Sequence, residues 1–306
     1  MRADLLRLAR RARGAARRLL HRGLTASAPA ILDPGAIARL PRGIVEQASR
    51  RLVSPLYLGD EVALCRVLTR YKMYIDARDQ DFGAHLLVDG YWESWATQFV
   101  ARTVRPGWTV ADVGANHGYY ALLLADLVGP SGRVFAIEPN PSTAALMKRS
   151  LALNGFAARS TVCEVAAGGP GEGEGSLWVP EWSPGHAALS PIAEAPPGMA
   201  SFKVPVATLD SLIGAGRRLD FLKIDAEGAE ERVVAGMERL IAHRPAMVLE
   251  FAAGRYADPA AFVDRLAAVY GAVREVGQDG RARPVDRQRL LTERPMEERL
   301  LFLSAS

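Results

Sequence analysis

The nine residues that decide the fold are Asp112-Val-Gly114-Ala-Asn116-His-Gly118-Tyr-Tyr120. A short apolar run of strand length precedes them, and an apolar stripe at helical spacing follows. Gly114 allows a sharp turn and a close approach of backbone to a ligand. Gly118 allows tight packing at the start of the helix, where free N–H groups face outward. The stretch therefore predicts a ligand-binding turn between a strand and a helix.

The chain beyond Pro106 alternates between strand-like and helix-like segments, which is the pattern of a parallel sheet with crossover helices. Apolar runs predict strands at 109–113, 134–137, 161–166, 221–224 and 247–251, and weaker ones at 273–276 and 300–303. An apolar stripe from Val233 to Ile241 predicts one helix that runs to Pro245. We therefore predict an α/β domain over 106–306, with a Rossmann-like, mostly parallel seven-stranded sheet and helices on both faces.

Two further zones precede this domain. Residues 1–35 are expected to be a basic tail and linker, because residues 1–22 hold eight arginines against one acid. A stretch rich in Ala, Ser, Pro and Gly follows them. Residues 36–105 are expected to be a helical lead-in, since apolar spacing predicts one helix over 62–71 and another over 92–100. The domain thus carries an N-terminal helical extension.

The charge of the chain is concentrated in its first residues. The whole chain carries +4 and residues 1–22 carry +7, so the remainder is −3. A nucleic-acid enzyme usually spreads a basic stripe over its working face, and none is visible, so no nucleic-acid partner is expected. On helical spacing Leu5, Leu8 and Leu19 share one face with arginines around it. Such a segment either contacts an anionic membrane or is a disordered tail.

Neither membrane spans nor secretion is expected. No apolar run approaches the ~18 residues that a spanning helix needs. The N-terminal arginines are not followed by the uninterrupted apolar stretch of a secretory signal. Cys65 and Cys163 have no disulfide-framework or zinc-binding spacing. We expect a cytoplasmic protein, with peripheral membrane contact through residues 1–22 as the open alternative; the sequence does not indicate an oligomeric state.

An acid on the next strand completes a cofactor pattern. Glu138 ends that strand, 24 positions after Gly114. A carboxylate there can accept hydrogen bonds from both ribose hydroxyls of an adenosine ligand. The helix N-terminus can receive a carboxylate of the ligand, and Asp112 can hold a positively charged amino group. Together these features predict S-adenosylmethionine as the cofactor.

A dinucleotide-binding fold is the main rival interpretation. Its fingerprint is GxGxxG, whose glycines let the backbone approach a pyrophosphate. Here Asn116 stands where the second of those glycines would be, and the carboxylate of Asp112 would repel a pyrophosphate. The spacing therefore disfavours an NAD-linked oxidoreductase.

Four segments resemble the FkbM-type methyltransferase family. They are Asp112–Gly118, Ile137-Glu138-Pro139-Asn140, Leu209-Asp210-Ser211-Leu212 and Leu222-Lys-Ile-Asp-Ala-Glu-Gly-Ala-Glu230. The last segment contains the most specific motif, Ile-Asp-x-Glu-Gly-x-Glu, and the resemblance spans about residues 90–251. It implies a class I methyltransferase fold and O-methyl transfer to a sugar or polyketide hydroxyl, so a small molecule or glycan is the expected acceptor.

The resemblance also implies which residues contact the cofactor. The lead-in Gly90-Tyr91-Trp92-Glu93 is expected to pack beside it. The residues expected to bind S-adenosylmethionine are Glu93, Asp112, Gly114, Asn116, Gly118, Tyr119, Glu138 and Asn140. The chain departs from the family at His117, where an aliphatic residue is usual, and at Phe251-Ala252-Ala253, where members often have a polar segment. These departures bear on the methionine-end contacts and on the acceptor side.

Three acids follow strands that should be neighbours in the sheet. Asp225, Glu227 and Glu250 are therefore expected at the crevice where such sheets bind ligands. Methyl transfer to an alcohol must remove one proton, and a positioned base typically adds 10²–10⁴-fold. Asp225 is the leading candidate for that base, followed by Glu250 and Glu227. Clustered carboxylates also suit Mg²⁺, although nothing in the sequence requires a metal.

Other residues have structural alternatives. Glu227 and Glu230 can simply stabilise the dipole of the helix that follows. Lys223 is expected to pair with a carboxylate, and His117 to be exposed beside the ligand. The long segment 168–205, with three aromatic residues, is expected to be a loop that covers the acceptor or merely anchors itself to the core.

The functional prediction is an S-adenosylmethionine-dependent O-methyltransferase of a sugar, polysaccharide or related natural product. Two alternatives remain open: an acceptor of another class (protein, lipid or small aromatic compound), and a methyltransferase-like module that binds without turnover.

Overall fold

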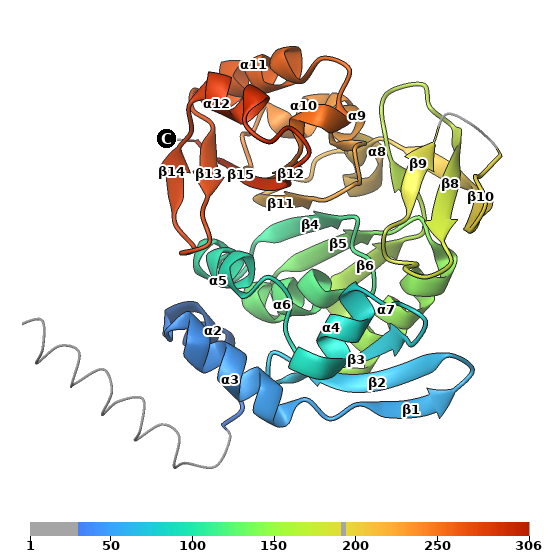
Figure 1. Cartoon of the computed structure of the whole chain (residues 1–306). Helices are drawn as coiled ribbons and strands as arrows, with labels where there is room; N and C mark the ends of the chain where they lie inside the picture. The colour runs from blue at the N-terminus through green and yellow to red at the C-terminus, as the bar shows by residue number, and fades with distance from the viewer. Residues whose placement is uncertain (1–29, 191–193, 306) are drawn as a thin grey trace, which may run out of the picture. The chain divides into compact units, whose positions relative to one another are not determined.

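The central sheet has eight strands in a computed structural model that describes residues 30–190 and 194–305 (Figure 1). Its strand order is β14-β13-β15-β12-β11-β4-β5-β6. The strands are β4 (Thr109–Val113), β5 (Arg133–Ile137), β6 (Ser160–Cys163), β11 (Phe221–Ile224), β12 (Ala246–Phe251), β13 (Arg274–Val276), β14 (Ala282–Pro284) and β15 (Arg299–Leu303). The predicted tail, residues 1–22, lies outside the described residues, so its contact with a membrane stays a prediction.

The middle of the sheet is parallel, as predicted. β12, β11, β4, β5 and β6 pair in parallel, and only β15, β13 and β14 run antiparallel at one side. All four residues of β11 are buried, because helices cover both faces of a parallel sheet. This is the Rossmann-like α/β fold. The difference from the prediction is an eighth strand, β14, which forms a hairpin with β13.

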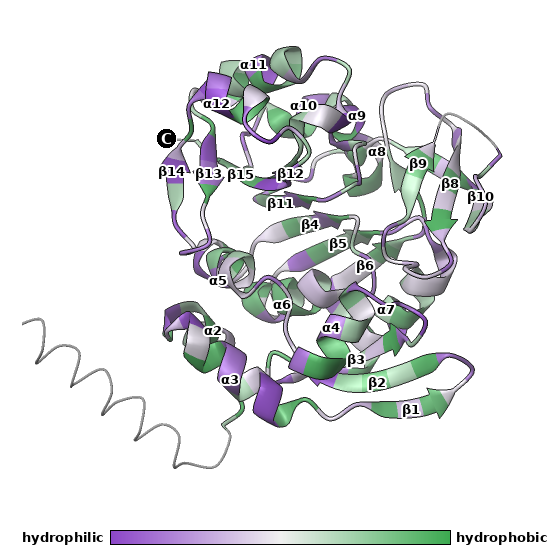
Figure 2. Ribbon diagram, in the orientation of Figure 1, coloured by the Kyte–Doolittle hydropathy of each residue, from purple (hydrophilic) through white to green (hydrophobic). Residues whose placement is uncertain are grey.

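Helices cover the two faces of the sheet and form two separate apolar clusters. In Figure 1, α5–α7 lie below the sheet and α8–α12 above it. Alternate residues of one strand enter different clusters: Val110 faces the α5–α7 side, and Ala111 and Val113 face the other. Figure 2 shows the apolar strands between these layers. The helices are α5 (Ser94–Thr103), α6 (Tyr119–Val128), α7 (Pro141–Leu153), α8 (Leu209–Ile213), α9 (Glu230–Ala235), α10 (Glu238–Ile241), α11 (Pro259–Tyr270) and α12 (Arg287–Thr292), with 3₁₀ turns η1 (Ala157–Arg159) and η2 (Ala253–Arg255).

The single helix expected from Val233 to Ile241 is two short helices, α9 and α10. The break falls at Gly236, where an added Cβ would lie 2.1 Å from the carbonyl oxygen of Gly168. The close approach of this neighbouring backbone explains why a helix with a continuous apolar stripe is interrupted.

The lead-in before the central sheet is not purely helical. It contains α2 (Pro34–Arg39), α3 (Arg42–Leu52), β1 (Leu56–Gly59), β2 (Val62–Val67), β3 (Tyr71–Asp76) and α4 (Phe82–Asp89). The helix predicted over 62–71 is wrong, because this segment forms two antiparallel strands. Along β2 every second residue is buried, and the turn places Leu68 and Thr69 in the left-handed region, which a helix excludes.

The small sheet β1-β2-β3 is attached to the main domain through one edge of β3. Its backbone N–H groups at alternate positions donate to side chains: Lys72 to Asn154 Oδ1 (3.0 Å), Tyr74 to Ser150 Oγ (2.9 Å) and Asp76 to His117 Nε2 (3.1 Å). These acceptors lie on α7, at its end and in the turn before α6. These side chains therefore satisfy the N–H groups at the edge of β3 in place of another strand. The bond to Asp76 also places His117 in the interior.

Residues 168–205 are not a loop, contrary to expectation. They contribute to a second sheet of order β7-β10-β8-β9, with β7 (Ala166–Ala167), β8 (Glu174–Pro180), β9 (Ala188–Ser190) and β10 (Met199–Ala207). One face of this sheet carries its own apolar cluster around Leu177, Val179, Val204 and Val206. Because this face is buried, the segment is an inserted structural unit next to the carboxyl ends of the main strands.

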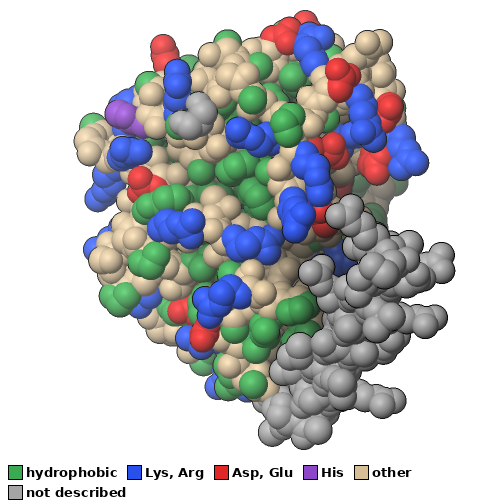
Figure 3. Space-filling model, turned by 90° about the vertical axis from the view of Figure 1, so that its left-hand side faces the viewer, with side chains coloured by type: hydrophobic (Ala, Val, Ile, Leu, Met, Phe, Trp, Pro, Cys, Tyr) green, Lys and Arg blue, Asp and Glu red, His purple; other side chains and the backbone are tan. Residues whose placement is uncertain are grey.

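The surface of the described residues shows mixed character. On the face in Figure 3, Lys and Arg side chains lie among hydrophobic, acidic and uncharged ones. Several arginines pair with acids, among them Arg283 with Asp279 and Arg287 with Asp264. Within residues 30–190 and 194–305, no helix has the length and apolarity needed to cross a membrane.

Candidate functional site

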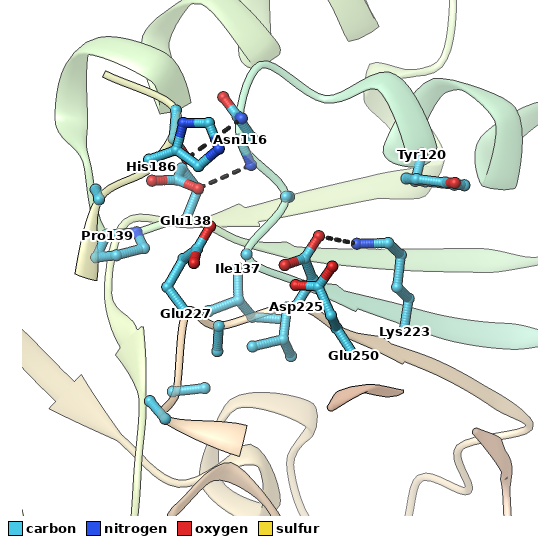
Figure 4. Close-up of a pocket in the computed structure, with 18 of the residues that line it drawn as sticks. Asn116, Tyr120, Ile137, Glu138, Pro139, His186, Lys223, Asp225, Glu227 and Glu250 are labelled. Atoms are coloured by element: carbon cyan, nitrogen blue, oxygen red, sulfur yellow. Dashed lines mark hydrogen bonds and ion pairs between the residues drawn. The ribbon is translucent and has the colours of Figure 1, made fainter. Parts of the chain in front are cut away.

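A cleft opens at the carboxyl ends of β4, β5, β11 and β12, where the sequence predicts it. It encloses about 1070 Å³, including space open to solvent, and is closed on one side by residues of the inserted sheet. Figure 4 shows the labelled side chains around it. Of the residues predicted for the site, the cleft is lined by Glu93, Gly114, Asn116, Tyr119, Glu138, Asp225, Glu227 and Glu250.

Gly114 forms the floor of the cleft, where only glycine fits. Its φ is +73°, and an added Cβ would lie 1.7 Å from the carbonyl oxygen of Asp225. The N–H groups of Gly114 and Ala115 donate to the carbonyl of Ile137 at 3.0 and 3.1 Å. Gly118 has a φ of +93°, and a Cβ there would meet Met147 at 2.6 Å. Gly114 thus makes the sharp turn and the close backbone approach that the sequence predicts, and Gly118 packs tightly against α7; Gly118, also predicted to contact the cofactor, does not line the cleft.

Glu138 is the most completely bonded acid of the site. Its Oε2 accepts from the N–H of Asn116 and its Oε1 from the N–H of Asn140, both at 2.8 Å. Burial raises its pKa to about 7, and the two backbone hydrogen bonds act in the opposite direction. Each oxygen keeps a further acceptor position. A buried carboxylate that is fixed by the main chain and borders the cleft suits the paired hydroxyls of a ribose.

Asp112 is buried with no hydrogen-bond partner for either carboxylate oxygen. Its pKa is raised to about 6 by burial, while the positive charge of Lys223, its neighbour across the β4–β11 pair, acts to lower it. An unpaired buried acid is costly unless a ligand completes it. Asp112 was predicted to contact the cofactor, but it does not itself line the cleft, so a cationic ligand such as S-adenosylmethionine would offset that cost only across the floor formed by Gly114 or through water.

The lead-in brings Glu93 to the opposite wall. Glu93 precedes α5 with φ 34° and ψ 60°, a left-handed conformation that is uncommon outside glycine. The hydroxyl of Tyr120 donates to Glu93 Oε2 at 3.4 Å. Burial, and then the negative charge of Asp225, raise the pKa of Glu93 to about 7. Tyr119 also lines the cleft, and its hydroxyl donates to the carbonyl of Trp92 at 3.2 Å.

Asp225 is paired with Lys223. The ammonium of Lys223 lies 2.8 Å from Asp225 Oδ2 and 4.8 Å from the ring centre of Tyr120. Burial would raise the pKa of Asp225. The charge of Lys223, and the hydrogen bonds that Asp225 makes with Glu250 and Lys223, hold that pKa below its usual range. Asp225 is therefore ionised at neutral pH. The pairing expected for Lys223 is present.

Glu250 and Glu227 lie beside Asp225 and share one cation. Arg255 Nη2 is 3.2 Å from Glu227, Arg255 Nη1 is 3.9 Å from Glu250, and Arg255 also pairs with Glu298. Burial and the charge of Asp225 raise the pKa of Glu250 to about 11, so Glu250 is protonated at neutral pH. Burial also raises the pKa of Glu227. Among the described residues, no group of three or more His, Cys, Asp or Glu side chains is placed to hold a metal ion.

Four residues occupy positions that the sequence did not predict. His117 was expected to be exposed, but it is fully buried, because it accepts from Asp76 and stacks on Phe82. Asn140 caps α7 by accepting from the N–H of Ser142, as its place before Pro141 indicates, but it does not line the cleft, where the sequence predicted it. His186 and Arg255 do belong to the site, although neither lies in a recognisable motif. Glu230 has a structural role, which was one of the alternatives expected for it. It accepts from the N–H groups of Ala226 and Gly228.

Comparison with known proteins agrees with this geometry. Residues 112–276 match the family model described as the methyltransferase FkbM domain. A protein-L-isoaspartate O-methyltransferase of Aeropyrum pernix is 36% identical over 113 residues, which is 37% of this chain and 38% of that protein. A second one, from Hyperthermus butylicus, is 36% identical over 88 residues, 26% of this chain and 33% of its own length. The matches thus span little more than a third of these relatives.

Solved structures of methyltransferases also align with the chain. The O-methyltransferase TomG of Streptomyces achromogenes, in complex with its cofactor, aligns with a TM-score of 0.39 and 15% identity over 70% of this chain and 79% of that one. A TehB-like methyltransferase of Corynebacterium glutamicum aligns with a TM-score of 0.40 and 12% identity over 73% and 94%.

Proposed function

The chain belongs to the methyltransferase FkbM domain family, and we propose that it is an S-adenosylmethionine-dependent O-methyltransferase acting on a hydroxyl of a sugar or related natural product. The observation that carries this proposal is Glu138, held by two backbone N–H groups beside the Gly114 turn, next to the unpaired carboxylate of Asp112. S-adenosylmethionine supplies a methyl group on a positively charged sulfur. An acid-lined cleft stabilises such a cation.

The cofactor end of the cleft would be built as follows. Glu138 would accept from the ribose hydroxyls, and Asn116 and Gly114 would present the turn on which the ligand rests. Asp112, below the floor, would balance the positive charge of the amino group, directly or through water. Glu93 and Tyr119 would border the methionine portion from the lead-in side.

The chemistry of the opposite end favours a hydroxyl acceptor. At neutral pH the protonated Glu250 can donate a hydrogen bond, while the ionised Asp225 can accept one. Trp92 and Tyr120 add aromatic surface to the same cleft. Donors, acceptors and aromatic rings together suit a polyhydroxylated molecule.

A second acceptor class comes from the archaeal relatives, which are named for methylation of L-isoaspartate in proteins. That acceptor is a carboxylate. Five acids, Glu93, Asp225, Glu227, Glu250 and Glu298, border this cleft against Lys223 and the neighbouring Arg255. Asp225 is ionised, so a carboxylate acceptor at that end would face a like charge, whereas a neutral hydroxyl would not; we therefore favour the hydroxyl.

Two acids compete for the proton of the acceptor. The sequence predicts Asp225, which we retain as a proposal because it borders the reacting end of the cleft. Its lowered pKa, however, makes Asp225 a weak base. Glu93 has a pKa of about 7, which is better matched to proton transfer at neutral pH. We propose that Asp225 orients the acceptor hydroxyl and takes its proton, with Glu93 as the alternative proton acceptor.

Calorimetry tests the cofactor, and a panel of acceptors tests the reaction. We expect micromolar binding of S-adenosylmethionine, about −8 kcal/mol, and no binding of NADH. Methyl transfer is then measured to reducing sugars, to oligosaccharides and to an isoaspartyl peptide. Binding of NADH without S-adenosylmethionine would refute the cofactor assignment. Transfer to the peptide alone would refute the hydroxyl acceptor. Tight binding with no transfer to any acceptor class would favour a non-catalytic module.

A further inference from the structure

The segment 181–187, which joins β8 to β9, lies against the cofactor end of the cleft. Three of its residues, Gly185, His186 and Ala187, line the cleft. Figure 4 shows His186 beside Asn116 and Glu138, away from Asp225 and Lys223. The segment therefore borders the part of the cleft that we assign to the nucleoside, not the acceptor.

On one side the segment is bonded to the residues that hold Glu138. Asn116 Nδ2 donates to the carbonyl of Gly185 at 3.4 Å, and Asn140 Nδ2 donates to the carbonyl of Pro184 at 3.3 Å. The backbone N–H groups of these same asparagines donate to Glu138. An added Cβ at Gly185 would lie 2.4 Å from Asn116 Nδ2, so a side chain there would disturb the contact. The segment and the carboxylate are thus positioned by the same two residues.

On its other side the segment is bonded to the lead-in. Ser183, which is fully buried, donates from Oγ to Asp79 Oδ1 at 3.1 Å. The N–H of Gln80 donates to the carbonyl of Trp182 at 2.9 Å. Asp79 is itself buried and also lies 3.9 Å from His117 Nδ1 in the cofactor turn. Ser183 therefore joins the segment to the buried contact between the lead-in and the cofactor turn.

Ser183 also fixes the ring of His186. The Oγ of Ser183 lies 2.7 Å from His186 Nδ1. A hydroxyl has one proton, and since Ser183 donates it to Asp79, its oxygen must accept from an Nδ1–H of His186. The far nitrogen, Nε2, then lies 3.5 Å from Asp81 Oδ2. The hydrogen bond to Ser183 therefore sets the orientation of the ring at the wall of the cleft.

We propose that the 181–187 segment retains the cofactor, with Ser183 and His186 as positioning residues that keep it closed over the nucleoside. This inference rests on the proposed function, because it needs an adenosine ligand at Glu138. Movement of the segment away from the cleft must break the hydrogen bond from Ser183 to buried Asp79. Hydrogen bonds to charged groups are among the stronger ones. Loss of this bond should therefore act on the dissociation rate of the ligand.

The experiment measures release of S-adenosylhomocysteine, the demethylated product, from the full-length chain and its variants by rapid-mixing displacement. We expect Ser183→Ala and His186→Ala each to raise the dissociation rate about tenfold or more. Because the two residues act as one unit, the double variant should exceed neither single variant appreciably. In turnover the effect should fall on the KM for S-adenosylmethionine and not on kcat.

Lys203→Ala is the matched control. It breaks the exposed pair between Lys203 and Glu174 on the same inserted sheet, without contact to the segment, and should leave the release rate unchanged. His186 is partly exposed, so its variant tests the inference even if Ser183→Ala does not fold.

Release within twofold of the unsubstituted protein, in folded variants, would overturn the retaining role while leaving the proposed function intact. If the double variant raised the dissociation rate by the product of the two single effects, Ser183 and His186 would not act as one unit, and that part of the proposal would be overturned. If the unsubstituted protein binds neither S-adenosylmethionine nor its product, the proposed function and this inference both fail.

Discussion

The two ends of the cleft hold their carboxylates by different means. At the cofactor end, Glu138 receives two backbone N–H groups, and its position follows from the path of the main chain. At the acceptor end, Asp225 and Glu227 are balanced by the side chains of Lys223 and Arg255. Both ends are acidic, but only one is fixed by the backbone.

This difference indicates which properties can change independently. Backbone donors stay in place as long as the fold does, so binding at Glu138 tolerates substitutions around it. Side-chain cations can be removed one at a time, and each removal changes the charge and pKa values of its neighbours. Cofactor binding is thus a property of the fold, whereas acceptor chemistry depends on a few exchangeable side chains.

The largest expected effect is a fall in the rate of methyl transfer when the acceptor end is changed. Asp225→Asn should lower methyl transfer by about 10²-fold or more while leaving cofactor affinity within a few-fold. Asn keeps the shape but neither takes a proton nor balances Lys223. Single-turnover rates and calorimetry on the same sample measure both quantities. Turnover near the unsubstituted rate would contradict the role of Asp225, and loss of rate in Glu93→Gln with a displaced pH profile would then assign the proton to Glu93.

The matching substitution at the cofactor end should weaken binding of the cofactor. Glu138→Ala removes an acceptor of charge-assisted hydrogen bonds and should weaken S-adenosylmethionine binding by roughly 1.5–3 kcal/mol. The rate at saturating cofactor should fall much less. Calorimetry gives the affinity, and the melting temperature shows whether the variant is folded. An unchanged dissociation constant in a folded variant would place the ribose elsewhere.

The pH dependence of binding should also differ between the ends. Burial raises the pKa of Glu138 to about 7, so the free protein holds a proton there below that pH. Since the ionised form accepts from both hydroxyls, affinity should increase with pH and level off above about 7, by up to about tenfold per unit below it. Calorimetry from pH 5.5 to about 8.5 measures this. Glu138→Gln should lose this dependence and keep only a weaker one from Asp112, near 6. An identical profile in the variant would contradict the assignment.

The smallest expected effect is at Glu250. Its pKa of about 11 means that it is a neutral acid at working pH, and a glutamine resembles it in shape and charge. Glu250→Gln should therefore keep the transfer rate within about threefold of the original. A loss comparable to that of Asp225→Asn would show that Glu250 acts in its ionised form. The contrast between these two adjacent acids is the sharpest check on the acceptor end.

The sequence predicted those parts of the molecule whose local residue pattern agrees with their place in the fold. β4 and β11 have the bounds predicted for them, because fully buried strands are continuous apolar runs between turn residues. The position of Glu138 followed from its spacing after Gly114. The strands β2 and β3 were missed, because apolar residues at intervals of one, three and five fit a helix as well as two short strands around a turn.

Contacts between distant segments could not be predicted. His117 is buried through a bond to Asp76, 41 residues earlier in the chain, and no local pattern indicates that partner. Arg255 contacts acids from three different segments, and His186 reaches the cleft because β8, β9 and β10 pair into a sheet. In a single sequence, nothing around a histidine or arginine outside a motif indicates which distant residues it will contact.

The crowded floor of the cleft has a consequence for protein engineering. A single methyl group on residue 114 would overlap the main chain of residue 225, so the site keeps its shape only while these two backbones stay in close contact. A library that aims at new acceptors should therefore leave the backbone between Ile224 and Gly228 untouched, without insertions or deletions. Diversity belongs at the side chains of Glu227 and Glu298, which line the cleft, and of Arg255, which pairs with both; the three come from separate segments.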